Sequence, residues 1–327
     1  MRRNPHVALS VALILILAAV FASKSAAQPR LPENVESRHV DLWSDGTRIS
    51  GDLFYPSDWS EDDERPAIVM SHGWGGTRQH LNTAYAPFFA AEGFVVLTID
   101  YRGWGDSDSK LVIAGEQPAP NENGEVTVKA HAVREVVDPI DQTEDIRNAI
   151  TYIQGEPGVD PQRIGLWGSS YSGGHVIWVA AHDPRVKATV SQVASMDSVE
   201  FIRDGRFLTG GLEEAHRLAV ARVRGDAPAY PTSEPAPGLQ GTPDYTRIAH
   251  YSPRDVAHQM KAAALIIDAE NEELFDIRDN GRAVYAILKN RVPTKYHVVK
   301  GAAHYDVYRE GREEALELAI EWYEEHL

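Results

Sequence analysis

The chain has 327 residues, which is enough for one large α/β domain or two smaller ones. Hydrophobic residues make up 43% of it and charged residues 24%, proportions that are ordinary for a soluble globular protein. The 48 acidic residues outnumber the 32 basic ones, and the formal charge of −16 argues against nucleic acid or an anionic membrane as a partner. The sequence contains no cysteine, which excludes disulfide bonds, thiol nucleophiles and lipid attachment to an N-terminal cysteine.

The N-terminus has the pattern of a secretory signal peptide. Arg2 and Arg3 precede an uncharged apolar run at 7–22, and small residues at 25–27 precede Gln28. We therefore expect a leader over 1–27, cleavage before Gln28, and a mature protein in the periplasm or the medium without stable membrane insertion. The apolar run is shorter than the roughly 20 residues that span a bilayer, which disfavours an uncleaved anchor. Loss of the leader leaves 29 basic and 48 acidic residues, a formal charge of −19.

After the leader, the pattern indicates a sheet that begins with a hairpin and continues with alternating strands and helices. Residues 35–43 and 48–55 alternate loosely around a turn at 44–47, which predicts an antiparallel hairpin. The later strands are uninterrupted apolar runs with helical segments between them, which indicates a mostly parallel, doubly wound α/β sheet. The predicted strands are 66–70, 94–99, 163–167, 188–193, 263–267 and 295–299. The predicted helices are 85–91, 146–153, 175–182, 277–289 and a final one that contains 316–323.

Two stretches break this alternation. Residues 111–129 read as a loop, and the longer stretch at 196–261 reads as a cap inserted into a single domain over 28–327. Within the cap, 201–223 is helical in pattern and 226–244 is rich in proline and glycine. Such insertions often select the substrate. The cap aromatics fit either an apolar pocket or a cap core: Phe201, Phe207, Tyr230 and Tyr245.

The stretch Gly168-Ser169-Ser170-Tyr171-Ser172-Gly173-Gly174 joins a predicted strand to a predicted helix through a sharp turn. A nucleophile elbow holds its serine in a strained backbone conformation and needs small residues two positions before and after it. Gly168 and Ser172 meet that demand around Ser170, which we prefer as the nucleophile. A register centred on Ser172 stays open. A second loose match at 105–109 leads into a polar loop rather than a helix.

A serine hydroxyl becomes a nucleophile when a base removes its proton, and a carboxylate orients that base. Candidates for both follow the ends of predicted strands, where ligands gather in open α/β sheets. His304 comes directly after the last strand, and an acidic cluster follows the strand that ends at Ile267. The cluster consists of Asp268, Glu270, Glu272, Glu273 and Asp276.

Acyl transfer also creates an oxyanion, which needs preorganised backbone donors. The expected pair is the N–H of Tyr171, the residue after Ser170, and the N–H of Trp74. Glycines at 73, 75 and 76 would let the backbone approach closely there. We expect His72 to shape this loop rather than to act as a base.

These motifs resemble the α/β-hydrolase superfamily, and within it the dienelactone hydrolase, acetyl xylan esterase and X-prolyl dipeptidyl-peptidase-like group of bacterial serine hydrolases. In that group the acid loop reads Gly-x-x-Asp, and the resemblance places Glu272 at the aspartate position. The resemblance implies a triad of Ser170, Glu272 and His304, with Glu270, Glu273 and Asp276 still in contention for the acid. Dienelactone hydrolases proper use a cysteine nucleophile, which this chain lacks. The matching stretches are 72–76, 100–105, 168–174, 269–275 and 301–306.

The sequence therefore predicts an exported serine hydrolase that cleaves a small-molecule carboxylic ester through an acyl-enzyme, with no metal and no cofactor. A peptidase or amidase on the same residues is the alternative, and a non-catalytic binding protein on the same fold is a third reading. An aminopeptidase needs acidic groups from the cap to hold the substrate's α-ammonium. The candidates for that role are Asp197, Glu200, Asp204, Glu213 and Glu214. The sequence leaves the substrate and the oligomeric state open.

The leader prediction is tested by N-terminal sequencing of protein recovered from the periplasm or the medium. We expect the sequence to begin at or near Gln28. Membrane-bound protein that retains Met1 would contradict the prediction.

Overall fold

The computed structural model describes residues 31–203, 205, 207–236 and 238–327. The predicted leader at 1–27 lies outside the described residues, as does Asp204 of the predicted cap. Residues from Pro32 to Leu327 form one compact unit. Among the residues that are described, no helix is both long and apolar enough to cross a membrane.

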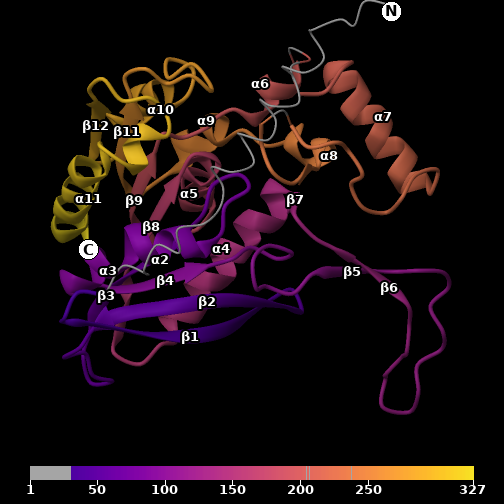
Figure 1. Ribbon diagram of the computed structural model, residues 1–327, viewed down its shortest axis with the longest axis horizontal. Helices are drawn as coiled ribbons and strands as arrows, with labels where there is room; N and C mark the ends of the chain where they lie inside the picture. The colour runs from indigo at the N-terminus through magenta and orange to yellow at the C-terminus, as the bar shows by residue number, and fades with distance from the viewer. Residues whose placement is uncertain (1–30, 204, 206, 237) are drawn as a thin grey trace, which may run out of the picture. The chain divides into compact units, whose positions relative to one another are not determined.

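The unit is built on an eight-stranded sheet with the order β1-β2-β4-β3-β8-β9-β11-β12 (Figure 1). β2 pairs antiparallel with β1 and with β4, and every later neighbour in the sheet is parallel. The predicted fold class, a mostly parallel α/β sheet, is confirmed. The strands are β1 Val35–Ser44, β2 Thr47–Pro56, β3 Arg65–Ser71, β4 Val95–Ile99, β8 Val159–Ser169, β9 Val186–Gln192, β11 Ala263–Ala269 and β12 Thr294–Val299.

Helices cover both faces of the sheet. Successive side chains of its central strand β8 point to opposite faces and contact different helices. Ile164 and Leu166 belong to the core cluster that includes residues of α4 and α5. Gly165 faces α11, where an added Cβ would lie 2.8 Å from the ring of Tyr323. The ring of Tyr323 packs in turn on Phe89 of α3, 5.6 Å between centroids. The helices are α2 Arg78–Ala84, α3 Ala86–Ala91, α4 Pro139–Gln154, α5 Tyr171–His182, α10 Gly281–Leu288 and α11 Arg312–His326.

The described part of the stretch predicted as a cap carries four α-helices, one short 3-10 helix and a small core of its own. The segment expected to be one helix over 201–223 forms two helices, because Gly210 and Gly211, at the start of the second helix, take positive φ angles of 92° and 61° that a continuous helix does not allow. Tyr245 lies in the cap core with Ile202, Ala215 and Ile248. The elements are α6 Ser198–Arg203, α7 Gly211–Arg224, β10 Thr242–Pro243, α8 Tyr245–Ile248, α9 Pro253–Val256 and the short helix η1 Ala257–Gln259, and β10 pairs with β7 Val136–Val137.

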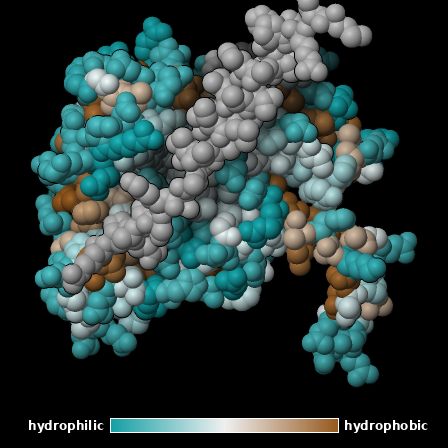
Figure 2. Space-filling view, in the orientation of Figure 1, coloured by the Kyte–Doolittle hydropathy of each residue, from teal (hydrophilic) through white to brown (hydrophobic). Residues whose placement is uncertain are grey.

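The stretch at 111–129, expected to be a loop, belongs to a hairpin arm. β5 Lys110–Ile113 and β6 Ala130–Val133 pair antiparallel and flank a long polar tip. The strands escaped prediction because each has four residues, too few for a clear alternation, and 16 residues separate them. Leu111 on the arm is 65% exposed, and Figure 2 shows apolar side chains along this arm at the lower right.

A buried histidine links α5 to the cap side of the core. His175 is completely buried; its Nδ1 lies 2.6 Å from the Tyr251 hydroxyl and its Nε2 lies 3.2 Å from Gln142 Oε1. Burial lowers the pKa of His175 to about 3, and the neighbouring His72 adds to the shift. The folded protein therefore holds His175 neutral at pH values where the unfolded chain protonates it.

This histidine should make folding less favourable in acid. Because its folded pKa lies below the unfolded value, its contribution to stability is present above about pH 6.5 and is lost as the pH falls toward 3, with a slope of at most about 1.4 kcal/mol per pH unit. We expect His175→Gln to reduce the loss of stability between pH 7.5 and 5, measured by urea unfolding at each pH. His131→Gln, at an exposed position on β6, is the matched control. An unchanged slope in His175→Gln would contradict the assignment.

Candidate active site

Ser170 lies at the junction of β8 and α5 with φ 58° and ψ −122°, a conformation that non-glycine residues rarely adopt. Close packing around the turn requires glycines. A Cβ at Gly168 would come 2.3 Å from the carbonyl oxygen of Ser172, and one at Gly73 would come 3.0 Å from the Cβ of Ser170. The sequence motif thus forms the sharp strand-to-helix turn that it predicts.

His304 connects Ser170 to Glu272 through hydrogen bonds. Its Nε2 lies 3.2 Å from the Ser170 hydroxyl, and its Nδ1 lies 2.8 Å from a carboxylate oxygen of Glu272. A carboxylate accepts hydrogen bonds, so the proton of the neutral ring belongs on Nδ1 and Nε2 is left to accept the serine proton. The side chains of His304 and Glu272 are 1% and 2% exposed, so water competes little for this pair. The structure therefore brings together all three residues of the predicted triad.

The other acids of the cluster have different partners. Glu270 pairs with Lys300 at 2.9 Å, and Asp276 pairs with Arg278 at 2.5 Å. Glu273 accepts a hydrogen bond from the backbone N–H of His304 at 2.8 Å. Within the described chain, Glu272 is the one member of the cluster with a carboxylate hydrogen-bonded to the imidazole, while Glu273 supports the same histidine from its backbone.

The fifth acid, Asp268, is fully buried near the end of β11. Burial raises its pKa to about 7, the hydrogen bond from the Tyr296 hydroxyl at 2.8 Å opposes that rise, and the charge of Glu272 adds to it. The Asp268 carboxylate therefore lies against Tyr296 and Gly281 at the start of α10, and no hydrogen bond joins it to the imidazole among the described residues.

The alternative serines face the interior. The Ser172 hydroxyl is fully buried, 2.6 Å from Ser71 Oγ, and it accepts from the Tyr101 hydroxyl at 3.3 Å. Ser107, in the second loose motif, is also buried and donates to the Asp100 carbonyl oxygen. Neither hydroxyl has a histidine partner among the described residues. Ser172 therefore serves the packing behind the turn, as the small residue two positions after Ser170.

The two backbone amides predicted for the oxyanion lie on loops that meet at Ser170. Tyr171 begins α5 directly after Ser170, and Trp74 follows Gly73, whose backbone lies against Ser170. The rings of Trp74 and Tyr171 pack edge to face, with 5.1 Å between their centroids. Within the described residues, neither backbone N–H has an intramolecular acceptor, so both remain available to a ligand. The N–H of Tyr171 also benefits from the positive end of the α5 dipole.

His72 is buried against this loop. Its Nδ1–H donates to the carbonyl oxygen of Gly73 at 3.0 Å, and its ring packs on Tyr101 at 4.4 Å. Burial lowers the pKa of His72, which keeps the ring neutral. This arrangement agrees with the structural role expected for His72.

A cavity of about 620 Å³ opens over Ser170 and His304. Its walls are mainly aromatic and aliphatic, and they come from the Trp74 loop, the cap, the acid loop and the segment after His304. Phe201 and Phe207 of the cap line it, whereas Tyr230 and Tyr245 do not. The other apolar lining residues are Trp74, Leu81, Trp167, Tyr171, Leu239, Leu274, Phe275, Tyr305 and Tyr308.

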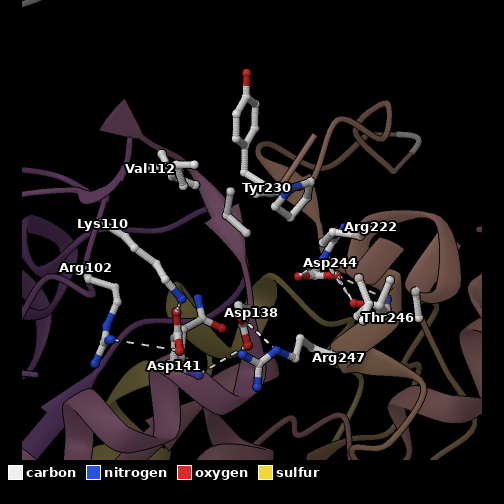
Figure 3. Close-up of a pocket in the computed structure, with 17 residues that line it drawn as sticks. Arg102, Lys110, Val112, Asp138, Asp141, Arg222, Tyr230, Asp244, Thr246 and Arg247 are labelled. Atoms are coloured by element: carbon white, nitrogen blue, oxygen red, sulfur yellow. Dashed lines mark hydrogen bonds and ion pairs between the residues drawn. The ribbon is translucent and has the colours of Figure 1, made fainter. Parts of the chain in front are cut away.

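A second cavity of about 370 Å³ lies between the hairpin arm, α4 and α7 (Figure 3). Its charged side chains pair with one another, and Tyr230 points away from them. No serine or histidine occurs among its described lining residues, so it lacks the serine and histidine pair found in the first cavity. The ion pairs are Lys110 with Asp141, Arg222 with Asp244 and Arg247 with Asp138, at 3.4, 2.8 and 3.7 Å.

The four described cap acids that could hold a substrate ammonium, Asp197, Glu200, Glu213 and Glu214, do not line the first cavity. Asp197 is buried and pairs with Arg254 at 2.5 Å, and Glu214 pairs with Arg217 at 2.6 Å. Glu200 lines a separate acidic hollow with the acid loop, and Glu213 is exposed on α7. No Asp or Glu occurs among the described residues that line the cavity over Ser170. In the described part of the chain there is also no group of three or more potential metal ligands.

Tyr308 is a site residue that motif reasoning missed. Its hydroxyl lies 2.6 Å from the Oγ of Ser169, the residue before the candidate nucleophile, and its ring lies 6.1 Å from His304. It belongs to the short helix η2 Asp306–Tyr308, four residues after His304 in the sequence. Its closeness to His304 in the sequence could have indicated a place in the site, but no known motif contains a tyrosine four residues after the histidine.

Comparison with known families decides the assignment. The family model described as X-Pro dipeptidyl-peptidase (S15 family) matches residues 45–276. The chain belongs to the S15 family. This S15 protein is similar, 28% identical over 295 residues, to an uncharacterized 31.7 kDa protein of Escherichia coli, covering 81% of this chain and 92% of that one. It is 36% identical over 158 residues to the quorum-quenching protein AidA of Acinetobacter baumannii, covering 48% and 44%.

Solved structures agree on the fold. A hypothetical protein of Pseudomonas aeruginosa is similar with a TM-score of 0.71 and 22% identity, covering 93% of this chain and 98% of that one. An acetyl xylan esterase of Paenibacillus sp. R4 is similar with a TM-score of 0.58 and 18% identity, covering 95% and 93%. Membership of the S15 family makes the chain an enzyme, a serine hydrolase of the α/β-hydrolase superfamily, as the sequence motifs predicted.

The choice between Ser170 and Ser172 can be tested by labelling with a fluorophosphonate probe. We expect Ser170→Ala to abolish labelling and to lower turnover by roughly 10⁴-fold or more, with an unchanged circular dichroism spectrum. Ser172→Ala should still be labelled, while losing about 1–3 kcal/mol of stability because the buried Ser71 hydroxyl loses a partner. Labelling that survives in Ser170→Ala and disappears in Ser172→Ala would reverse the assignment.

Proposed function

We propose that this S15 protein is an exported carboxylic ester hydrolase that works through an acyl-enzyme at Ser170. The observation that carries the proposal is the hydrogen-bonded chain from Ser170 through His304 to Glu272 at the base of an apolar cavity. Export rests on the predicted leader at 1–27.

In the first half of the reaction, Ser170 Oγ forms a bond to the ester carbonyl carbon while its proton moves to Nε2 of His304. Glu272 accepts from Nδ1–H and stabilises the imidazolium that results. The backbone N–H groups of Trp74 and Tyr171 donate to the oxyanion. The bond to the alcohol oxygen then breaks, and His304 delivers its proton to the departing alcohol.

In the second half, water attacks the acyl-enzyme. His304 takes the proton of the water, the new C–O bond forms, and the acid product leaves as Ser170 recovers its proton. Every proton in this scheme passes through the histidine, so the tautomer held by Glu272 decides whether either half can proceed.

Esters are favoured over X-prolyl peptides by the lining of the cavity. A dipeptidyl-peptidase must neutralise the substrate's α-ammonium, and the described lining residues include no carboxylate for that purpose. An alkoxide also leaves more readily than an amine. Membership of the S15 family supports peptide cleavage as the second candidate, which the substrate comparison below separates from ester cleavage.

The role of Glu272 can be tested by neutralising the acids one at a time. We expect Glu272→Gln to lower kcat by roughly a thousandfold or more, because the amide no longer selects the Nδ1–H tautomer. Glu270→Gln and Asp276→Asn are matched controls, since each acid has a basic partner of its own, and they should retain most of the activity. Loss of activity in either control but not in Glu272→Gln would contradict the proposed role.

The substrate class can be tested on one preparation with two kinds of chromogenic substrate. We expect kcat/KM for p-nitrophenyl esters to exceed kcat/KM for X-Pro p-nitroanilides by at least about tenfold. The ester has the better leaving group, and the described lining offers no carboxylate for the α-ammonium of the anilide. Both activities should disappear together in Ser170→Ala. A preference for the anilide would overturn the esterase proposal and leave the triad in place.

A further inference from the structure

An arginine belongs to the wall of the cavity over Ser170. Among the described residues that line it, Arg309 is the only lysine or arginine, and no aspartate or glutamate accompanies it. Arg309 follows the short helix η2 and lies next to Tyr308, which reaches the nucleophile turn through Ser169. The guanidinium therefore belongs to the same cavity as Ser170 and His304.

Arg309 makes no ion pair, and its side chain forms no hydrogen bond, with the described residues. Its neighbour Arg312 donates to the Ala84 carbonyl oxygen at 2.8 Å and stacks over Phe88 at 4.9 Å. Two acids lie close to Arg309 in the sequence. The adjacent Glu310 forms no ion pair with it among the described residues, and Asp306 accepts from the backbone N–H of Ala303 at 2.9 Å. In a chain where acids outnumber basic residues by 48 to 32, an unpaired arginine beside an apolar cavity is left free for a ligand.

The chemistry of the ligand follows from the charge and shape of the wall. A guanidinium binds a carboxylate through a planar fork of donors, and the apolar wall would hold a hydrocarbon body between that carboxylate and the reacting carbonyl. A phosphate monoester fits less well, because one cation would face two negative charges in a protein of strongly negative charge.

We propose that Arg309 selects substrates that carry a carboxylate: the enzyme cleaves apolar esters whose acyl or alcohol part ends in a carboxylate that Arg309 binds. The assignment rests on the proposed ester hydrolysis and adds the substrate class to it. Arg309 is a specificity residue and takes no part in proton transfer. Because the side chain is exposed, its contribution should weaken with added salt.

The test compares matched anionic and neutral esters. The p-nitrophenyl monoester of heptanedioate against p-nitrophenyl octanoate places the carboxylate on the acyl side. The butanoate ester of 4-hydroxyphenylacetate against 4-ethylphenyl butanoate places it on the alcohol side. We expect Arg309→Gln to lower the anionic-to-neutral ratio of kcat/KM about fivefold in at least one pair, mainly through KM, and 0.5 M NaCl to lower the wild-type ratio.

The control variant is Lys261→Gln, which removes one positive charge from an exposed position outside the cavity. It should keep the wild-type ratios. Ratios that are unchanged in Arg309→Gln for both pairs, or that fall equally in Lys261→Gln, would overturn the proposal while leaving ester hydrolysis in place.

If no ester is turned over, the proposed function fails, and a binding measurement still decides the role of Arg309. Calorimetry would then compare heptanedioate with octanoate on the wild type and on Arg309→Gln. Heptanedioate binding that weakens about fivefold in the variant would uphold the carboxylate site, and equal binding would overturn it.

Discussion

The backbone strain at Ser170 is the constraint on which the rest of the site depends. A serine at φ 58° costs on the order of 1–3 kcal/mol and persists because its surroundings leave no alternative. Its N–H donates to Gln192, and its carbonyl oxygen accepts from the amides of Gly173 and Ser195. Val193, a β-branched residue at φ 38°, lies between these partners and donates to Ile267. The strain of the turn is thus shared with the end of β9.

That turn projects Ser170 to the edge of the sheet where the parallel strands end. β3 delivers the Trp74 loop, β8 the nucleophile, β11 the acid loop and β12 the histidine, so four segments distant in sequence converge there. Parallel strands make this convergence a consequence of topology, because all of their carboxyl ends lie at one edge. Buried contacts at the turn, such as the hydrogen bond between Ser71 and Ser172, then hold the turn in place.

Chemistry and selection are divided between different parts of the chain. The triad and the amides would perform the same acyl transfer on many esters, whereas the cap and the segment after His304 form the apolar wall. S15 membership describes the shared machinery, whereas the preference for esters over peptides that we propose rests on the lining of the cavity, where no carboxylate occurs among the described residues. Arg309 adds a positive charge to that wall, where it would distinguish substrates by the group remote from the reacting ester.

The sequence by itself determined the fold class and the candidates for the chemistry, because buried parallel strands are apolar runs and the nucleophile turn demands small residues in order. It placed Ser170, Trp74 and His304 at strand ends and narrowed the acid to a short cluster. Local sequence could not choose among Glu270, Glu272, Glu273 and Asp276, since all lie on one loop and differ only in what they meet in space. In the tertiary structure Glu270 pairs with Lys300, Asp276 pairs with Arg278, and Glu273 accepts from a backbone amide. Glu272 is the acid that contacts the imidazole. Only the tertiary structure also shows that a hairpin arm forms, that the predicted cap helix is interrupted and which residues line the cavity. These features depend on long-range packing that no local pattern encodes.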